Sequence, residues 1–293
     1  MSKLDAFKSV LERAADAKAL TWLGLGGPIE ALARPQDQAQ LLALLKVASQ
    51  ENVDVKMLGD GASVLVSDVG APGLVLQLSA ASFTELKVDG TRVRAGAGAK
   101  LGNLVTTATS AGLAGVEGLV GIPGTVGAAL AINVSTSDAT LGQYVESAKV
   151  ATYQGEILEL TRDDFLFGYR SSNLENVVIL EATFRFEQDQ PEELVKRMQK
   201  FWIVRKKKTS DLENLGYARM FKNPRGQSAA ELIDQAGFRG AAVGAARVSM
   251  VDPNLVCAEK DCKSDDVKRL VTLIQTQARE RIGVDLELEI VIW

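Results

Sequence analysis

Apolar residues recur at helical spacing in several segments of the chain. This pattern predicts helices over residues 36–50, 100–115, 191–208, 228–237 and 264–283. Close to the N-terminus, an amphipathic helix that packs on the body of the protein is predicted by the spacing of Leu4, Phe7, Val10, Leu11 and Ala14.

Alternating apolar and polar residues predict strands between these helices, over residues 53–61, 73–78, 145–160, 177–188 and 284–293. The sequence VDGTRV, residues 88–93, has two alternating runs about an Asp-Gly pair and predicts a hairpin. Strands and helices are mixed without a regular βαβ repeat, and several strands look antiparallel. An α+β fold is therefore predicted. Charged residues become denser after Gln190, which predicts a domain boundary there.

The composition is that of an ordinary globular protein. The chain has 293 residues, of which 46% are hydrophobic and 24% are charged, so it is long enough for two or three compact domains. A net charge of −4 gives no broad basic surface, which argues against nucleic acid as a partner. No apolar stretch is long enough to span a membrane and no signal peptide precedes the first helix, so a cytoplasmic protein is expected. The oligomeric state stays open, with a monomer favoured.

The sequence contains no histidine, which excludes an imidazole base, a histidine metal ligand and a His-based triad. The two cysteines, Cys257 and Cys262, do not have the spacing of a zinc or redox site, so free thiols and no metal are expected. Any chemistry must use carboxylates, Ser, Tyr, Lys, Arg or a cofactor.

Glycine-rich turns occur at residues 21–28, 58–68 and 121–129. Glycine lets a backbone approach a phosphate closely and present consecutive N–H groups to it, but tight turns and close strand packing use the same residue. None of these turns matches the Rossmann or the P-loop pattern. They are candidates for binding a phosphate or pyrophosphate, and the alternative of plain tight turns stays open.

Four motifs together resemble one known family. They are GIPGTVGAA at residues 121–129, FGYRSSN at 167–173, MFKNPRG at 220–226 and GVDLELEI at 283–290. Their order and separations are similar to those of the UDP-N-acetylenolpyruvoylglucosamine reductase family in its compact form. That family makes UDP-N-acetylmuramate for peptidoglycan, and thus serves cell wall biogenesis, cell shape and cell division. The likeness runs from about Thr21 to the C-terminus.

The resemblance implies vanillyl-alcohol-oxidase-type (PCMH-like) FAD-binding domains and a C-terminal α/β substrate-binding domain. The expected boundaries are 1–75, 76–190 and 191–293. FAD is the implied cofactor, NADPH the reductant and a UDP-sugar the substrate. The residues expected at the FAD pyrophosphate are Gly121, Ile122, Gly124, Thr125 and Gly127 in one loop, and Gly59, Gly61, Ala62 and Ser63 in a second.

The resemblance also implies which residues act on the substrate. Arg170 matches the arginine that stabilises the enolate-like intermediate, and Glu289 matches the glutamate that assists it. Without the family match, Arg170 would be interpreted as a surface ion-pair partner and Glu289 as an outward residue of a strand. Tyr169, Lys222 and Asn223 match substrate-binding positions, and Asn223 would contact the UDP part.

The sequence departs from the family pattern at several places. The family has a serine or cysteine as proton donor where this chain has Arg219, and a histidine where it has Asp252. Arginine is a poor proton donor because its guanidinium stays protonated. Tyr217 or a water molecule are alternative donors. The first FAD loop ends in GAS, residues 61–63, instead of Gly-Ser-Asn, and NVS, residues 133–135, replaces Asn-Ala-Gly.

Three functions are consistent with these residues. The leading hypothesis is an NADPH-dependent flavin reductase of UDP-N-acetylglucosamine enolpyruvate with an altered proton-delivery step. The competing hypothesis is a non-catalytic paralogue that retains the fold and FAD or UDP-sugar binding. A flavin oxidase of a different sugar is the third.

Overall fold

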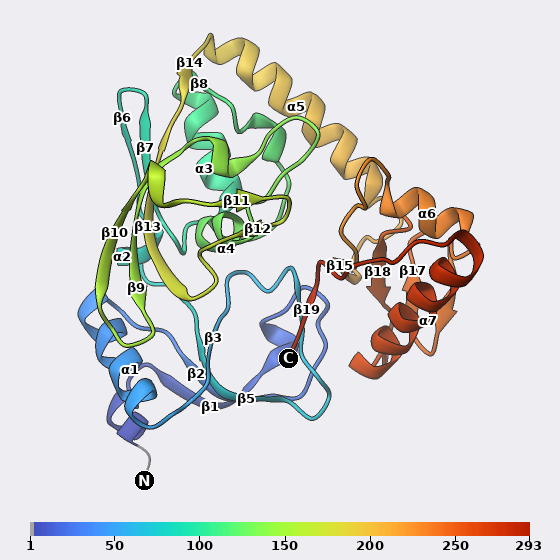
Figure 1. Cartoon of the computed structure of the whole chain (residues 1–293), viewed down its shortest axis with the longest axis horizontal. Coiled ribbons are helices and arrows are strands. Elements are labelled where there is room, and N and C mark those ends of the chain that lie inside the picture. The colour runs from blue at the N-terminus through green and yellow to red at the C-terminus, as the bar shows by residue number, and fades with distance from the viewer. Residues whose placement is uncertain (1–2) are drawn as a thin grey trace. The chain divides into compact units, whose positions relative to one another are not determined.

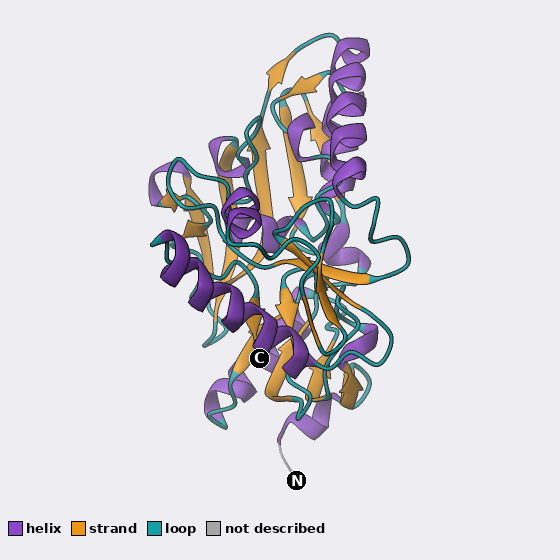
Figure 2. Ribbon diagram, turned by 90° about the vertical axis from the view of Figure 1, so that its right-hand side faces the viewer, coloured by secondary structure: helices purple, strands orange, loops and turns teal. Residues whose placement is uncertain are grey.

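The computed structural model describes residues 3–293, which divide into two compact units. The first unit contains the chain up to Ala14, together with Glu30–Asp60 and Pro72–Val204. The second contains Ala15–Ile29, Gly61–Ala71 and Arg205–Trp293. Figure 1 traces the chain, and Figure 2 shows helices mixed with strands and long loops, as the predicted α+β class requires. The division into three domains stays a prediction.

The first unit has an antiparallel sheet in the order β10-β9-β13-β7-β6, visible as adjacent strands in Figure 1. The strands are β6 (Leu86–Asp89), β7 (Arg92–Gly96), β9 (Val145–Thr152), β10 (Ile157–Thr161) and β13 (Val177–Arg185). Strands β6 and β7 form the hairpin that the Asp-Gly pair predicted, with Gly90 at φ +56°. Helices α3 (Leu101–Ser110) and α4 (Val126–Ala131) contact this sheet. Leu101, Leu104 and Phe184 are buried in the core that results.

Another sheet has the order β1-β2-β5-β3. Its strands are β1 (Leu11–Asp16), β2 (Pro28–Ala33), β3 (Val55–Met57) and β5 (Ala71–Leu76), and the predicted helix α1 (Gln38–Gln50) follows β2. Asp37 caps α1 by accepting a hydrogen bond from the Gln40 N–H at 2.8 Å. Leu41, Leu44 and Leu45 of α1 are buried in the same core as Leu74 and Leu76 of β5.

The predicted N-terminal helix is wrong. The structure has a 3₁₀ turn, η1 (Lys3–Phe7), and then strand β1. Ala14 lies at φ +51°, which no α-helix accommodates. The apolar spacing alone did not reveal the strand. Because β1 is a neighbour of β2 in the sheet, pairing with a strand distant in sequence overrides the local helical pattern.

The second unit has the sheet β15-β18-β17-β16, whose strands are β15 (Gly216–Arg219), β16 (Ala242–Val243), β17 (Ala246–Val248) and β18 (Leu255–Ala258). The predicted helices α6 (Ala229–Gln235) and α7 (Ser264–Ile282) pack on each other, and α7 also contacts β16 and β17. The predicted C-terminal strand is short: β19 (Val291–Ile292) pairs in parallel with β4 (Val64–Leu65), and Leu288 pairs singly with Phe221.

Helix α5 (Pro191–Lys208) confirms the prediction for residues 191–208. The remaining elements are short: α2 (Ala81–Thr84), β8 (Leu113–Ala114), β11 (Phe167–Gly168), β12 (Ser171–Ser172), β14 (Glu187–Gln188), η2 (Ala17–Ala19), η3 (Glu117–Leu119), η4 (Leu141–Gln143) and η5 (Arg162–Asp164). Over residues 3–293, no helix combines the length and the apolar character that crossing a membrane demands.

Candidate active site

Two of the glycine loops meet within the first unit. A Cβ added to Gly59 would lie 2.7 Å from Thr125 Oγ1 and 3.0 Å from Ala128 Cβ, so the loop after β3 passes directly against the start of α4. Asp60, the next residue, forms an ion pair with Lys100. The two loops that the sequence assigned to one cofactor are therefore neighbours.

The loop at residues 121–127 uses its glycines in two different ways. The Gly127 N–H donates to Ala97 O at 2.8 Å, and a Cβ at Gly127 would lie 2.8 Å from Ala97 Cβ, so close packing requires this glycine. Gly124 has φ +128°, and nothing lies within 4 Å of the position of its missing Cβ. Gly121 is also left-handed, at φ +73°. Open backbone is thus found at Gly124.

The same loop leads directly into α4. Thr125 is the N-cap, and its Oγ1 accepts a hydrogen bond from the Ala128 N–H at 3.4 Å. The preceding Ile122 N–H donates to Leu119 O at 3.2 Å and so closes a local turn. The end of the loop is anchored by the Val126 N–H, which donates to Ala99 O at 2.8 Å.

The rest of the predicted second cofactor loop belongs to the second unit. Gly61 has φ +69°, and a Cβ there would lie 2.0 Å from Leu20 O, so only glycine fits. Ala62 follows, half-buried, and Ser63 accepts the Val291 N–H at 2.9 Å through its carbonyl. The boundary between the two units falls between Asp60 and Gly61.

Arg170 occupies the tip of a tight hairpin in the first unit. Gly168 of β11 pairs with Ser171 of β12, which leaves Tyr169 and Arg170 as the turn residues. Arg170 has φ +52°, a conformation that glycine or asparagine usually supplies at this turn position. Tyr169 is 54% exposed. A strained backbone at a non-glycine residue persists only where its surroundings hold it, and such residues cluster at functional sites.

An open hollow of about 660 Å³ borders this hairpin. It is lined by Arg162, Phe165, Leu166, Phe167, Gly168, Ser171, Ser172 and Asn173. Phe165 and Phe167 are stacked, with ring centroids 5.6 Å apart, and Arg162 Nη1 donates to Gly142 O at 2.6 Å. The hairpin that carries Arg170 therefore forms part of the wall of a hollow.

The two main departures from the family pattern contact each other in the second unit. Arg219, the last residue of β15, has its Nη2 2.9 Å from Asp252 Oδ2. The Asp252 side chain is 6% exposed and that of Arg219 is 35% exposed. Asp252 Oδ1 also accepts the Asn254 N–H at 3.1 Å. The guanidinium is therefore held by a buried carboxylate, and the two substitutions form one ion pair.

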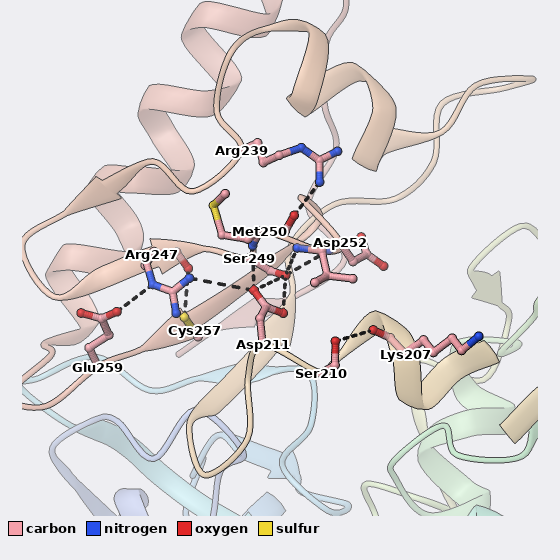
Figure 3. A network of polar contacts seen from close by, with 11 residues as sticks. Lys207, Ser210, Asp211, Arg239, Arg247, Ser249, Met250, Asp252, Cys257 and Glu259 are labelled. Atoms are coloured by element: carbon pink, nitrogen blue, oxygen red, sulfur yellow. Dashed lines mark hydrogen bonds and ion pairs between the residues drawn. The ribbon is translucent and has the colours of Figure 1, made fainter. Parts of the chain in front are cut away.

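A polar network fixes the loop that carries Asp252. Asp211 accepts hydrogen bonds from Ser249 Oγ at 3.0 Å and from the Met250 N–H at 2.7 Å, as Figure 3 shows. Ser249 Oγ in turn accepts the Asp252 N–H at 3.0 Å. Arg239 Nη1 donates to Met250 O at 2.6 Å. The loop is thus held from several sides.

Tyr217 stands two residues before Arg219 on β15, so the two side chains share one face of the strand. Its ring makes an edge contact with Trp22 at a centroid distance of 5.8 Å. Burial raises the pKa of the Tyr217 phenol, and a hydrogen bond with Thr209 opposes that shift. Any phenol is protonated at neutral pH, and the raised pKa makes Tyr217 a weaker acid than an exposed tyrosine.

The C-terminal segment brings Glu289 next to the end of β15. The Glu289 N–H donates to Met220 O at 2.8 Å, so Glu289 is opposite the residue that follows Arg219. Lys222 forms an ion pair with Glu287 of the same segment. Asn223 Oδ1 accepts the Ala229 N–H at 3.0 Å, at the first residue of α6.

The site residues thus fall in both units. The first unit contains Gly59, Gly121, Ile122, Gly124, Thr125, Gly127, Tyr169 and Arg170. The second unit contains Gly61, Ala62, Ser63, Tyr217, Arg219, Lys222, Asn223 and Glu289. Cys257 and Cys262 are free thiols. No cluster of potential metal ligands is found among residues 3–293.

The comparisons with known proteins agree over nearly the whole chain. The FAD binding domain family matches residues 29–161, and the C-terminal domain of UDP-N-acetylenolpyruvoylglucosamine reductase matches residues 210–293. The UDP-N-acetylenolpyruvoylglucosamine reductase of Rhodopirellula baltica is 37% identical over 93% of this chain and 89% of its own length. This chain belongs to the UDP-N-acetylenolpyruvoylglucosamine reductase family.

Other members are similar over comparable lengths. UDP-N-acetylenolpyruvoylglucosamine reductase 2 of Symbiobacterium thermophilum is 34% identical over 97% of this chain and 92% of its own. The crystal structure of the reductase from Thermus caldophilus matches with a TM-score of 0.82 and 30% identity, over 97% of this chain and 98% of that chain. The predicted family and fold class are confirmed.

FAD is the cofactor of this reductase family, and the glycine loops of the first unit are suited to bind it. At Gly59 a side chain would collide with the neighbouring loop, and at Gly124 a left-handed backbone borders open space. A pyrophosphate needs such bare backbone, because N–H groups bind its oxygens only at close approach. Asp60 and Lys100, paired beside Gly59, place one charge of each sign next to the loops.

Sequence reasoning missed the partners that hold the candidate residues. It named Asp252 as a departure but did not pair it with Arg219. It also missed Asn254, whose Oδ1 accepts the Phe221 N–H at 2.9 Å and whose Nδ2 donates to Phe221 O at 2.7 Å. The local signal was present in Asp-Pro-Asn, residues 252–254, a typical turn sequence. The residue that this turn holds is Phe221, which lies more than 30 positions away and cannot be predicted from the motif.

Proposed function

We propose that this reductase-family protein reduces the enolpyruvyl double bond of UDP-N-acetylglucosamine enolpyruvate to give UDP-N-acetylmuramate, with NADPH as reductant. The observation that carries this proposal is the match to named reductases over 93% of this chain and 89% of the relative. When bound, FAD supplies the hydride that is added to the double bond. We further propose that the protein acts as a cytoplasmic monomer in peptidoglycan precursor synthesis.

The residues of the chain provide charge stabilisation. Hydride addition to the terminal carbon of the enolpyruvyl double bond leaves negative charge on the carbon next to the carboxylate, which delocalises onto that carboxylate until this carbon takes up a proton. A fixed guanidinium stabilises such charge because it is planar, bidentate and always protonated. We assign this role to Arg170, with Glu289 assisting. Tyr169, Lys222 and Asn223 are proposed to bind the substrate, and Asn223 its UDP part.

Arg219 is proposed to act as an electrostatic group and not as the proton donor. Its ion pair with the buried Asp252 holds the guanidinium in place, so it adds positive charge at the family donor position, and a guanidinium is a poor proton donor. The proton then comes from the Tyr217 phenol, which shares a strand face with Arg219, or from water. Replacing Tyr217 by Phe separates the two: turnover is lost if Tyr217 donates and is unchanged if water does.

A non-catalytic paralogue is the second candidate, favoured by the same Arg219–Asp252 pair. An ion pair at the donor position is compatible with a protein that binds its ligands without catalysing the reduction. Such a protein would retain FAD or the UDP-sugar but would not complete the reduction. The two candidates predict different fates for a flavin that NADPH has reduced.

The deciding experiment is an anaerobic absorbance titration of the purified protein in one cuvette. FAD is reconstituted, NADPH is added to bleach the flavin bands, and UDP-N-acetylglucosamine enolpyruvate follows. Return of the oxidised spectrum with formation of UDP-N-acetylmuramate supports the reductase. Flavin that bleaches and stays reduced supports the paralogue, and a protein that binds no FAD contradicts both the cofactor and the reaction. Light scattering of the same sample tests the monomer.

A further inference from the structure

The hairpin that carries Arg170 is tied to α4 by side chains outside the hairpin turn. Asn133, just beyond the end of α4, donates from its Nδ2 to Gly168 O at 2.8 Å. Ser172 Oγ donates to Ala131 O, the last residue of α4, at 2.6 Å. One bond holds each strand of the hairpin, at Gly168 directly before the turn residues Tyr169 and Arg170 and at Ser172, two residues after Arg170. Figure 1 shows β11 and β12 beside α4.

Asn133 is itself fixed by its surroundings. It is 5% exposed, and its Oδ1 accepts the Gly142 N–H at 3.0 Å. Its backbone has φ +46°, which asparagine tolerates better than most residues. A Cβ on Gly142 would lie 2.6 Å from Asn133 Oδ1 and 2.8 Å from the Phe167 ring, so the space around the amide is filled. Both hydrogen-bonding atoms of the amide are therefore used, and the side chain cannot swing away.

Helix α4 connects this clamp to the glycine loop. The helix is short, from Val126 to Ala131, with Thr125 and Gly124 immediately before it. Asn133 and Ala131 at its end hold Gly168 and Ser172, which both line the hollow. The strained turn at Arg170 needs such support, because a left-handed arginine relaxes when the strands around it are free to move.

We propose that Asn133 is a positioning residue for Arg170, holding the β11–β12 hairpin to the end of α4 through the Gly168 carbonyl, with Ser172 as the second tie. This inference rests on the proposed function, since it takes Arg170 as the group that stabilises the reacting substrate. Asn133 does not itself act on the substrate. It fixes the turn from which Arg170 projects.

The test uses the full chain reconstituted with FAD and compares three variants. Asn133→Asp keeps the acceptor for the Gly142 N–H but puts an oxygen opposite the Gly168 carbonyl, so it replaces the tie by repulsion between two oxygens. Ser172→Ala removes the second tie and is the milder change. Thr136→Ala is the matched control, because the Thr136 hydroxyl accepts the Asp138 and Ala139 N–H groups in the same segment and is bonded to neither strand of the hairpin.

The readouts are kcat and KM, the FAD dissociation constant, and the rate at which trypsin cleaves after Arg170, followed by mass spectrometry of the fragment ending there. For Asn133→Asp we expect kcat to fall by about 10²-fold, the effect of misplacing a catalytic group by about 1 Å. We expect faster cleavage after Arg170 and unchanged FAD affinity. Ser172→Ala should show the same changes at smaller size, and Thr136→Ala none of them.

Other results overturn the inference. If Asn133→Asp and Ser172→Ala both keep wild-type kcat, the ties do not position Arg170, whatever the cleavage rate. If both lose FAD binding and thermal stability together with kcat, Asn133 has only a structural role. A wild-type protein that binds FAD but never turns over contradicts the proposed function and not the clamp. In that case the cleavage rate alone decides whether the ties hold the hairpin. An unchanged cleavage rate in both variants would refute the inference that they do.

Discussion

Arg170 combines an unfavourable backbone with the side chain on which the proposed reaction depends. At φ +52° a residue with a Cβ is disfavoured by about 1–2 kcal/mol relative to glycine. Glycine itself would cost about 0.5–1 kcal/mol in additional chain entropy. The two terms oppose each other, so stability gives no reason for an arginine here and function does.

We therefore expect Arg170→Gly to change the free energy of unfolding by less than about 1 kcal/mol while lowering kcat by about 10²-fold or more. Arg170→Lys keeps the charge but loses the planar fork and should give an intermediate kcat. Urea unfolding and steady-state kinetics on the same preparations check both values. A large loss of stability in Arg170→Gly would show that the arginine has a structural role instead.

The Arg219–Asp252 pair predicts a coupling between two substitutions. Arg219→Ser leaves a carboxylate that is 6% exposed without its cation, and we expect a loss of about 1–3 kcal/mol in the free energy of unfolding. Asp252→Asn removes the charge as well, so the double variant should be more stable than the sum of the single losses by about 1 kcal/mol. Urea unfolding of the three variants measures this coupling. Purely additive losses would mean that the ion pair contributes nothing.

At the scale of elements, the start of α4 combines close packing with an open backbone. Gly127→Ala would place a methyl group 2.8 Å from Ala97 Cβ and 3.1 Å from Ala97 O. The loop must then shift, and we expect about 1–3 kcal/mol of destabilisation together with weaker FAD binding. Gly102→Ala in α3, where nothing lies within 4 Å of the new Cβ, is the control and should be neutral or stabilising. Fluorescence titration with FAD and thermal unfolding distinguish the two.

The N-terminus of α7 predicts a pH dependence of stability. Hydrogen bonds from the Lys263 N–H, and then from the Ala245 N–H and Arg269, lower the pKa of Asp266 despite its burial. A carboxyl with a lowered pKa in the folded state stabilises the protein above its unfolded pKa of about 3.9, and the contribution is lost as pH falls through the folded value.

Asp266→Asn should therefore be less stable than the wild type by a constant amount of about 1–2 kcal/mol between pH 8 and 5. The gap should close below about pH 4, where the wild-type carboxyl takes up its proton. Urea midpoints across this range make the comparison. A gap that persists unchanged at pH 3 would assign the loss to packing and not to charge.

At the scale of the whole molecule, the proposed cofactor should contribute to stability. FAD binds the folded chain and not the unfolded one, so each tenfold excess of free FAD over its dissociation constant adds about 1.4 kcal/mol at saturation. We expect the apoprotein to unfold at a lower temperature than the holoprotein, with a midpoint that rises with FAD concentration. Differential scanning calorimetry with and without FAD measures this difference in the unfolding midpoint. Identical midpoints at saturating FAD would contradict cofactor binding.

Much of the architecture was readable from the sequence. The hairpin at Asp89–Gly90 was predicted from its turn residues, and helices α1, α3, α5, α6 and α7 were predicted from the spacing of their apolar residues. The family was readable from four short motifs, because their order and separations together are specific. The absence of histidine limited the chemistry in the same way.

Only the tertiary structure decided the remainder, because it depends on contacts between residues distant in the chain. Pairing with β2 made a strand of the segment in which helical spacing was read. A distance of 33 residues separates Arg219 from Asp252, and 35 separate Asn133 from Gly168. No local pattern encodes such partners. The charge and shape of a side chain indicate which kind of group it can bind, but only the tertiary fold determines which residue lies next to it. The sequence by itself determined the candidate residues, and the fold determined what holds them in place.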